Sequence, residues 1–380
     1  MNPRLSLHLD LMRALAALVV LASHFAYERF SGGALRELRD LNLGSDAVVV
    51  FFVLSGFVIA YAAETRDRTA ARFLFNRATR LWTVAAPALL ATMALDRTGA
   101  LIAPQAYVQP WFNDLPAAQM LLSGLGFSNE WLGQGVRLGS NGPWWSLSYE
   151  AAYYLIFAAV FFLDGWRRWA IALALCILAG PRVLLLLPVW AMGVLAWRAI
   201  ASGHVDGIGL ATARLLAAAP LLLYPALLAT DAPTQLSALT SALTGWSPAE
   251  IVVHLRFSDE ALWNTVLGLL ATSHVLGMAR LTQRTAANPH PETNAGQRAI
   301  RYVAGASFSV YLLHYPLMQF LHVALAGLPE PLRAASILVL TLAGCFAFAA
   351  LFERPLAQWR ELVFSMGPAG LRRACGAAIT

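Results

Sequence analysis

The sequence predicts an all-α membrane protein with about ten transmembrane helices. Two observations lead to this fold class. The 380 residues are 58% hydrophobic and only 13% charged, whereas soluble chains carry about 25% charged residues. The apolar residues also gather in runs near the length needed to cross about 30 Å of hydrocarbon. These runs are residues 11–28, 46–63, 81–96, 143–163, 168–180, 183–200, 209–230, 260–281, 302–325 and 334–352.

The basic residues between these runs predict an orientation. All 27 are Arg. With the N-terminus inside, eighteen of them fall in or next to cytoplasmic segments and eight in outer ones. Because basic loops stay on the cytoplasmic side, we expect both termini in the cytoplasm. We also expect one domain over residues 1–355 and a short cytoplasmic tail over 356–380. Positive charge dispersed over short loops does not indicate nucleic-acid binding.

The first run contains Arg13 and His24, and Asp10 lies immediately before it. Ionisable groups inside hydrocarbon are costly, so they usually face protein or a water-filled path and mark function. At about 100° per residue, Arg13 and His24 project from one helical face, roughly 16 Å apart along the axis. They therefore serve two ends of one extended ligand or two separate tasks. The alternative is a membrane anchor with a flanking positive charge and a hydrogen-bonded interior histidine.

Two further features follow along the chain. Ser55-Gly56 in the second run predicts close helix packing. Before the third run, Arg77 and Arg80 lie three residues apart on one helical face, with Arg72 near them. Guanidinium groups bind phosphate oxygens through paired hydrogen bonds, so this cluster suits a polyphosphate ligand. Anchoring by cytoplasmic positive charge explains the same arginines.

Two outer segments, 97–142 and 231–259, are long enough to have a function of their own. The first contains a short apolar stretch at 117–127, which we expect to form a helix that is either re-entrant or interfacial. We expect these two segments to determine which molecule the protein accepts.

The fourth run contains Glu150, about seven residues or roughly 10 Å below its outer end. A carboxylate at that depth needs a partner. His24 lies at a similar depth, so we expect the two side chains to meet, with Glu150 fixing the tautomer of His24 and favouring its charged form. The alternative is a structural tie, in which Glu150 bonds Tyr154 one turn further on.

The ninth run contains Tyr311 and His314 on one face. The preferred interpretation is a polar lining for a channel, and a hydrogen-bonded core histidine is the alternative. The spacing of the histidines and carboxylates does not indicate a metal site, and the three Cys form no CxxC pair. We therefore expect no metal.

Taken in order, these motifs resemble the acyltransferase-3 family of membrane acyltransferases. The resemblance covers about residues 10–355, and six motifs in the right order make it specific. In the family, an aromatic residue or a proline usually follows the Arg-x-x-Arg motif closely. Here that motif is Arg77 to Arg80, and it is followed by Trp82, with Pro87 further on. The motifs are Leu9-Asp10 with Arg13 and His24, Phe51 to Phe57, Arg77 with Arg80, Trp145 to Glu150, Ser309 to Pro316, and Phe352 to Pro355.

The resemblance implies transfer of an acyl group, most often acetyl, from cytoplasmic acetyl-coenzyme A to a hydroxyl of a cell-surface or lipid-linked carbohydrate. It places the chain in a bacterial inner membrane, in contact with membrane lipids. His24 is the expected general base and Glu150 its orienting partner. The expected donor-binding residues are Arg13, Arg72, Arg77 and Arg80. The expected lining of the substrate path is Asp10, Trp145, Ser148, Tyr311 and His314.

Several points stay open at this stage. The acyl group is acetyl by default, with succinyl or a longer chain as alternatives. Transfer is direct or passes through an acyl-histidine intermediate. The rival function is a proton-coupled transporter or flippase, because intramembrane acids, arginines and histidines also occur in such carriers. Carriers often have two related halves, and the sequence has no such internal symmetry.

Overall fold

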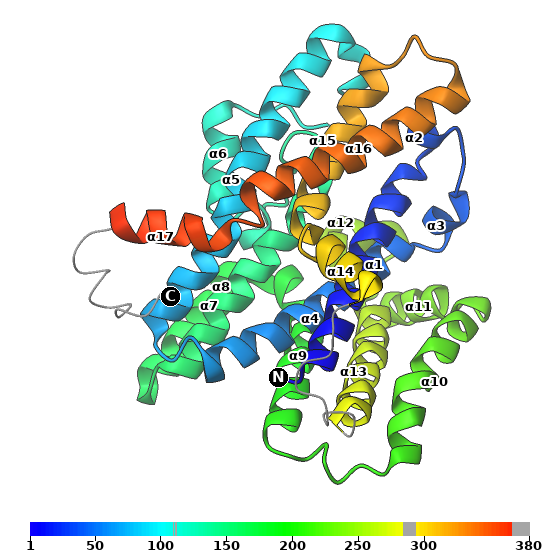
Figure 1. Cartoon of the computed structure of the whole chain (residues 1–380). Helices are drawn as coiled ribbons and strands as arrows, with labels where there is room; N and C mark the ends of the chain where they lie inside the picture. The colour runs from blue at the N-terminus through cyan, green and yellow to red at the C-terminus, as the bar shows by residue number, and fades with distance from the viewer. Residues whose placement is uncertain (109, 111, 284–293, 367–380) are drawn as a thin grey trace. The chain divides into compact units, whose positions relative to one another are not determined.

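The computed structural model describes residues 1–108, 110, 112–283 and 294–366. Throughout these ranges the chain forms helices joined by turns and loops, and the only β-type pairing in them is an isolated bridge between Leu138 and Asn141 (Figure 1). The predicted all-α fold class is confirmed. Most of the predicted cytoplasmic tail, from residue 367 onward, lies outside the described residues.

Each of the ten predicted runs contains a helix. Eight helical segments of the described chain are long and apolar enough to cross a membrane, as expected for a polytopic membrane protein. Of the other two runs, α9 is a shorter apolar helix of 15 residues, and α15 has 18 residues with several buried polar side chains. The ten helices are α1 (Pro3–Phe25), α4 (Leu43–Thr65), α5 (Ala70–Ile102), α7 (Trp145–Phe162), α8 (Gly165–Leu185), α9 (Leu187–Ala201), α10 (Leu210–Ala229), α13 (Ala261–Gln283), α15 (Ser307–Ala324) and α16 (Glu330–Phe352).

Helix α5 is much longer than the third predicted run. It begins after Thr69, whose side-chain hydroxyl caps the helix by accepting a hydrogen bond from the backbone N–H of Arg72 at 3.3 Å. The predicted arginine cluster, Arg72, Arg77 and Arg80, is therefore part of the same 33-residue helix that continues into the third run.

The two long outer segments are themselves partly helical. The apolar stretch predicted at 117–127 forms α6 (Ala117–Leu125). Segment 231–259 folds into α11 (Ala232–Thr244), α12 (Pro248–Leu255) and the 3-10 turn η4 (Arg256–Ser258). The remaining short elements are α2 (Glu28–Ser31), α3 (Arg36–Asp40), η1 (Pro104–Ala106), η2 (Trp131–Gly133), η3 (Gly142–Trp144), α14 (Ala295–Ala304) and α17 (Leu356–Met366).

The chain divides into two compact units that interleave in sequence. Unit 1 comprises Met1–Ala16, Ser45–Glu64 and Gly180–Ala304, and unit 2 comprises Ala17–Gly44, Thr65–Ala179 and Gly305–Thr380. The N-terminal part of α1, with Asp10 and Arg13, belongs to unit 1, and its C-terminal part, with His24, belongs to unit 2.

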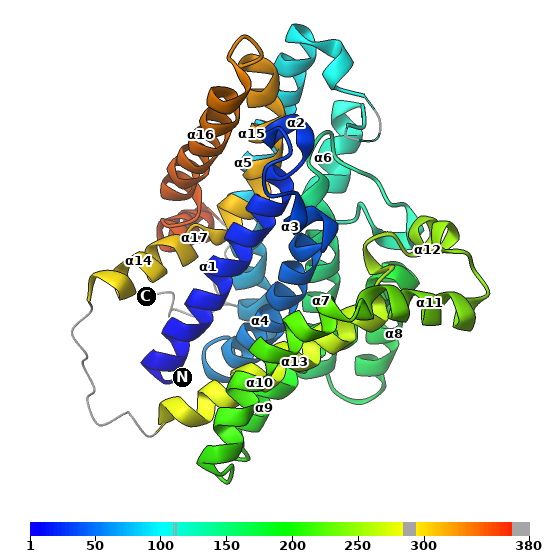
Figure 2. The same cartoon turned by 90° about the vertical axis from the view of Figure 1, so that its right-hand side faces the viewer.

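Unit 1 is held together by close helix packing. Helices α10 and α13 run side by side (Figure 2), and α13 also packs on α9. Gly56 of α4 lies so close to α9 that a Cβ atom added to it would collide with the carbonyl oxygen of Trp190, and one on Gly193 would collide with that of Val53. The predicted packing role of Ser55-Gly56 is confirmed, and Ser55 also accepts a hydrogen bond from the Trp190 indole at 3.2 Å.

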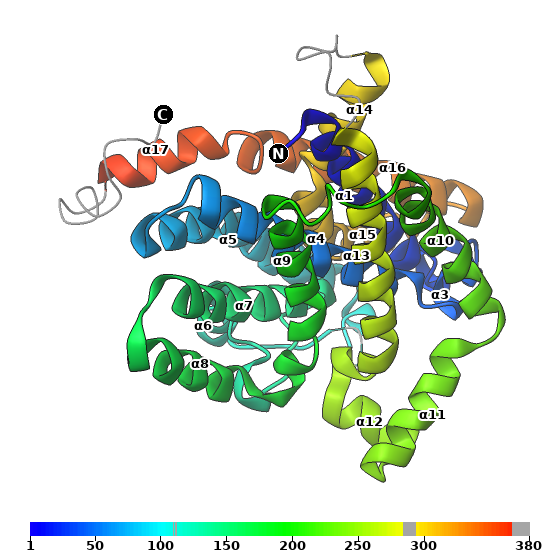
Figure 3. The ribbon, with the colours of Figure 1, turned by 90° about the horizontal axis from the view of Figure 1, so that it is seen from below.

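Unit 2 is built around α5 and α15. Helix α15 packs against both α5 and α16 (Figure 1), and α7 and α6 pack against α5. Helix α17 crosses next to α5 (Figure 3). The C-terminal part of α1 belongs to the same unit, so His24, Glu150, His314 and the arginine cluster all lie in unit 2.

Candidate active site

His24 and His314 form an imidazole pair. His24 lies in the last turn of α1, whereas His314 lies in the middle of α15 and is fully buried. The Nε2 atom of His314 is 3.0 Å from Nδ1 of His24. Each ring is also anchored to its own helix, because His24 Nδ1 is 3.0 Å from the carbonyl oxygen of Val20 and His314 Nδ1 is 2.7 Å from that of Val310.

These contacts determine which nitrogen of His24 is basic. A carbonyl oxygen only accepts hydrogen bonds, so neutral His314 has its hydrogen on Nδ1 and presents the lone pair of Nε2 to His24. His24 Nδ1 therefore faces two acceptors and donates to them. The lone pair of the neutral His24 ring is then on Nε2. In the described part of the chain no hydrogen bond occupies that atom, so it can accept a proton from a substrate.

Two tyrosines pack against His24. The ring of Tyr315, the residue after His314, meets the His24 ring edge-on with centroids 5.2 Å apart. The ring of Tyr27 stacks beside it at 6.2 Å. Aromatic packing of this kind fixes the orientation of the imidazole without using its Nε2 atom. Tyr315 was not among the predicted site residues, although its position inside the Ser309 to Pro316 motif was a signal.

Tyr311 and Ser146 connect α15 to the start of α7. The Ser146 hydroxyl donates to the Tyr311 hydroxyl at 2.8 Å, and the Tyr311 hydroxyl donates to the carbonyl oxygen of Pro143 at 3.1 Å. Asn141 adds a third tie, since its amide donates to the carbonyl oxygen of Leu312 at 2.9 Å. The motif from Trp145 to Glu150 and the motif from Ser309 to Pro316 are thus in direct contact.

Glu150 lies on α7 and accepts a short hydrogen bond from Tyr154, one turn further along the same helix. This contact is the one that the structural alternative predicted. The imidazole partner of His24 is His314, for which the sequence predicted a channel lining or, as the alternative, a hydrogen-bonded core histidine. An interaction between Glu150 and His24 stays a prediction.

Trp145 and Ser148 occupy the first turn of α7. The Ser148 hydroxyl is fully buried and bonds the side-chain oxygen of Asn129 at 2.6 Å, which anchors the loop after α6. Trp145 is half-buried and packs edge-on against Tyr149, with ring centroids 5.0 Å apart. Their predicted place in a substrate path stays a prediction.

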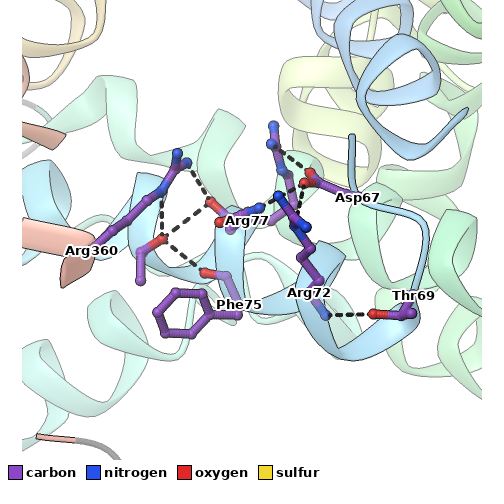
Figure 4. Close-up of polar contacts among 8 residues, drawn as sticks. Asp67, Thr69, Arg72, Phe75, Arg77 and Arg360 are labelled. Carbon is purple, nitrogen blue, oxygen red and sulfur yellow. Dashed lines mark hydrogen bonds and ion pairs between the residues drawn. The ribbon is translucent and has the colours of Figure 1, made fainter. Parts of the chain in front are cut away.

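A second polar cluster surrounds Asp67, just before α5 (Figure 4). Its buried carboxylate forms ion pairs with Arg77 at 3.1 Å and with Arg72 at 3.9 Å. It also accepts a hydrogen bond from the amide of Asn76 at 2.6 Å. Asp67 therefore holds two of the predicted arginines together.

Arg360 of α17 joins this cluster from the far end of the chain. Its guanidinium donates to the carbonyl oxygen of Asn76 at 3.1 Å and to the Thr79 hydroxyl at 3.2 Å (Figure 4). Burial lowers the pKa of Arg360 to about 10, and the positive charges of Arg77 and Arg80 act in the same direction. Throughout the described ranges, Arg80 forms no ion pair. The cluster thus has four guanidinium groups around the single carboxylate of Asp67.

Neither Asp67 nor Arg360 is among the site residues predicted from the sequence. Asp67 stands between two arginines in Arg66-Asp67-Arg68, a pattern that resembles any charged loop. Arg360 was counted only as a basic residue of the tail, because docking of α17 on α5 involves residues far apart in sequence.

Arg13 and Asp10 lie in unit 1, where they form an ion pair on α1 at 3.0 Å with both side chains partly exposed. Their predicted roles, in donor binding and in lining the substrate path, stay predictions. Over the described residues there is no group of three or more His, Cys, Asp or Glu side chains arranged to hold a metal ion.

Comparison with known proteins identifies the family. Residues 7–350 match the model of acyltransferase family 3, described as an acyltransferase domain. A stretch of 152 residues is 36% identical to acyltransferase MdmB of Streptomyces mycarofaciens. That stretch covers 38% of this chain and 36% of the relative's length. No solved structure matches the chain. The family match covers most of the protein, so the chain belongs to the acyltransferase-3 family of membrane acyltransferases.

Proposed function

We propose that the protein transfers an acetyl group from acetyl-coenzyme A to a hydroxyl of a cell-surface or lipid-linked carbohydrate. The observation that supports this most directly is the lone pair on Nε2 of His24, which follows from the contacts of Nδ1 with His314 and Val20. A neutral imidazole with a fixed lone pair is suited to remove a proton from a hydroxyl group. General base catalysis of this kind typically contributes about 10²–10⁴-fold.

In the proposed reaction, Nε2 of His24 accepts the proton of the acceptor hydroxyl while the hydroxyl oxygen attacks the thioester carbonyl carbon. The carbon–sulfur bond then breaks, and the imidazolium returns the proton to the departing sulfur. The products are an acetyl ester and the coenzyme A thiol. Throughout, the N–H at Nδ1 keeps its contacts with Val20 and His314, which stabilises the imidazolium.

An acyl-histidine intermediate is the alternative course. There Nε2 attacks the thioester itself, and the acceptor hydroxyl then attacks the acetyl-imidazole. Quenching the enzyme with acid in the absence of acceptor, followed by mass spectrometry of the His24 peptide, separates the two courses.

The Asp67 cluster is the proposed site for the phosphates of the donor. Arg72, Arg77 and Arg80, together with Arg360, supply more positive charge than Asp67 neutralises. Guanidinium groups bind phosphate oxygens in pairs of hydrogen bonds. Coenzyme A combines a polyphosphate head with a long thin arm, so its phosphates and its thioester can occupy separate sites.

Glu150 is proposed to stabilise the imidazolium of His24, with Tyr154 holding its carboxylate in place. Arg13 is proposed to line the entry of the donor, held by Asp10. Trp145, Ser148, Tyr311 and His314 are proposed to line the path near the reacting groups. The proposed setting is a bacterial inner membrane with both termini in the cytoplasm.

The test is release of coenzyme A thiol from acetyl-coenzyme A by the purified full chain in detergent, supplied with a panel of neutral and acidic sugars. We expect His24→Ala to lower the release at least about 100-fold without lowering the melting temperature. Arg77→Ala/Arg80→Ala is expected to raise the KM for acetyl-coenzyme A. Arg68→Ala, an exposed arginine before α5, is the control.

Full thiol release by His24→Ala would refute the general base. If the wild type neither releases thiol nor is stabilised by acetyl-coenzyme A, the donor is another compound. If no acyl donor reacts, the transporter or flippase becomes the better explanation.

A further inference from the structure

Three arginines gather around the two tyrosines that pack on His24. Arg29 of α2 lies over both rings, with its Cζ 4.7 Å from the centroid of Tyr27 and 5.7 Å from that of Tyr315. The Cζ of Arg39, from α3, lies 4.0 Å from the Tyr27 centroid. The Cζ of Arg137, from the loop before α7, lies 5.4 Å from the Tyr315 centroid. We call Arg29, Arg39, Arg137, Tyr27 and Tyr315 the guanidinium cage.

The cage is held in place by its own contacts. Arg29 donates a short hydrogen bond to the Tyr315 hydroxyl, and Arg137 donates to the carbonyl oxygen of Ser140 at 3.2 Å. The Tyr27 and Tyr315 rings meet edge-on with centroids 6.3 Å apart. All these residues belong to unit 2. Arg29 and Arg39 come from two consecutive short helices, and Arg137 joins them from a segment about 100 residues further along the chain.

The positive charge of the cage is poorly balanced. Among the described residues, no carboxylate lies within ion-pair distance of Arg39 or Arg137. Arg36, three residues before Arg39, pairs with Asp40 at 3.3 Å. Asp96 interacts electrostatically with Arg137, but its two carboxylate oxygens already accept hydrogen bonds from Ser140 at 2.8 and 2.6 Å.

Burial adds to this imbalance. Arg29 is half-buried, and burial lowers the pKa of its guanidinium, with the positive charge of Arg137 acting in the same direction. Arg39 and Arg137, which have no carboxylate within ion-pair distance among the described residues, would be stabilised by a bound anion that they contact through charge-assisted hydrogen bonds. The rings of Tyr27 and Tyr315 attract the guanidinium groups, but they carry no negative charge that would neutralise them.

We propose that the guanidinium cage binds an oxyanion of the acceptor, a carboxylate or a phosphate, next to the hydroxyl that His24 activates. This inference rests on the proposed function and names the class of acceptor as acidic. The His24 ring is 5.2 and 6.2 Å from the two cage tyrosines, so the oxyanion and the reacting hydroxyl belong to the same or neighbouring sugar units. A sugar acid and a sugar phosphate both meet this requirement.

The cage differs from the Asp67 cluster in its position and in its composition. The Asp67 cluster contains one carboxylate shared by two arginines, whereas the cage combines arginines with aromatic rings that contact His24. Coenzyme A phosphates are the competing source of an oxyanion for the cage, so the experiment must separate donor from acceptor.

The experiment measures binding to the purified full chain in detergent by thermal stabilisation at constant ionic strength, with no acyl transfer required. The probes are methyl glucuronide, inorganic pyrophosphate and, as the neutral match, methyl glucoside. The variants are Arg39→Gln/Arg137→Gln and, as the matched control from the same helix as Arg39, Arg36→Gln. Circular dichroism and the melting temperature without ligand check that each variant is folded.

We expect at least one oxyanion probe to bind wild type and Arg36→Gln alike, and to bind Arg39→Gln/Arg137→Gln about tenfold or more weakly. Methyl glucoside should show no such difference. Saturating coenzyme A should leave oxyanion binding at the cage intact. The proposal is overturned if neither oxyanion depends on Arg39 and Arg137, or if coenzyme A displaces the one that does.

The outcome is independent of the proposed catalysis. Cage-dependent oxyanion binding without thiol release supports the anion site and contradicts the acetyl transfer. Thiol release with a neutral acceptor, unchanged in Arg39→Gln/Arg137→Gln, supports the transfer and contradicts the acidic acceptor. If transfer occurs, the KM for an acidic acceptor should rise in the double variant while the KM for acetyl-coenzyme A stays unchanged.

Discussion

His314 offers the sharpest test of the imidazole pair. We predict that His314→Leu lowers kcat without changing the KM for acetyl-coenzyme A. Leucine fills a similar volume but removes the acceptor that faces Nδ1 of His24 at 3.0 Å. His24 keeps its contact with the carbonyl oxygen of Val20, so the basic atom remains Nε2 and the base is weakened but still present.

The magnitude follows from the charge that develops on His24. In the transition state the ring becomes an imidazolium, and a hydrogen bond to a charged group is worth about 1.5–3 kcal/mol. Losing it should lower kcat by about tenfold to 150-fold. If little charge developed on His24, the lost hydrogen bond would be one between neutral groups, worth about 0.5–1.5 kcal/mol, and the loss of kcat would be smaller.

The assay is thiol release over a range of acetyl-coenzyme A concentrations, which gives both kcat and KM, with His314→Gln for comparison. The glutamine side-chain oxygen can accept from Nδ1 of His24, so His314→Gln should recover much of the lost rate. A purely structural role of His314 would lower the melting temperature in both variants equally. The reasoning is refuted if His314→Leu has the wild-type kcat, or if its defect appears only in the KM.

Further predictions concern the Asp67 cluster, the packing of α4 on α9, and the hydrogen bond between Tyr154 and Glu150 on α7. Arg360→Gln should weaken coenzyme A binding about threefold to tenfold in calorimetric titration, and an unchanged Kd would exclude Arg360 from the donor site. Gly193→Val should abolish monodisperse protein in size-exclusion chromatography because its Cβ meets the backbone of Val53, whereas Gly327→Ala, with open space around it, should behave as wild type. Tyr154→Phe, which removes the hydrogen bond to Glu150, should lower the melting temperature by roughly 2–5 °C; no change would mean that this bond adds nothing to stability.

The sequence was sufficient to predict the helices because their length and apolarity are local properties. Each predicted run contains a helix, and the arginines before the third run lie on α5 as their spacing required. The prediction of ten spans was based on apolarity and on the distribution of arginines between the runs. It treated α9 and α15 like the others, although α9 is short and α15 contains buried polar residues that serve the site.

The partners within the site were harder to predict. Counting residues along a helix gives the depth of a side chain but not the direction in which the helix is rotated. Glu150 was predicted as a partner of His24 because the two lie at a similar depth. In the structure, the rotation and packing of α15 bring His314 to the Nδ1 atom of His24. The contacts of Arg360 could not be predicted from the sequence because they depend on where α17 packs against α5.

The double anchoring of the imidazole pair has a consequence for covalent inhibition. An electrophile such as diethyl pyrocarbonate reacts with an imidazole nitrogen that has an available lone pair. His314 is fully buried, with Nδ1 on a carbonyl oxygen and Nε2 on its neighbour, so it is shielded from the reagent. His24 is half-buried and offers only Nε2. Within the imidazole pair, such a reagent would therefore label only Nε2 of His24, and the labelled atom would record the tautomer of the resting enzyme.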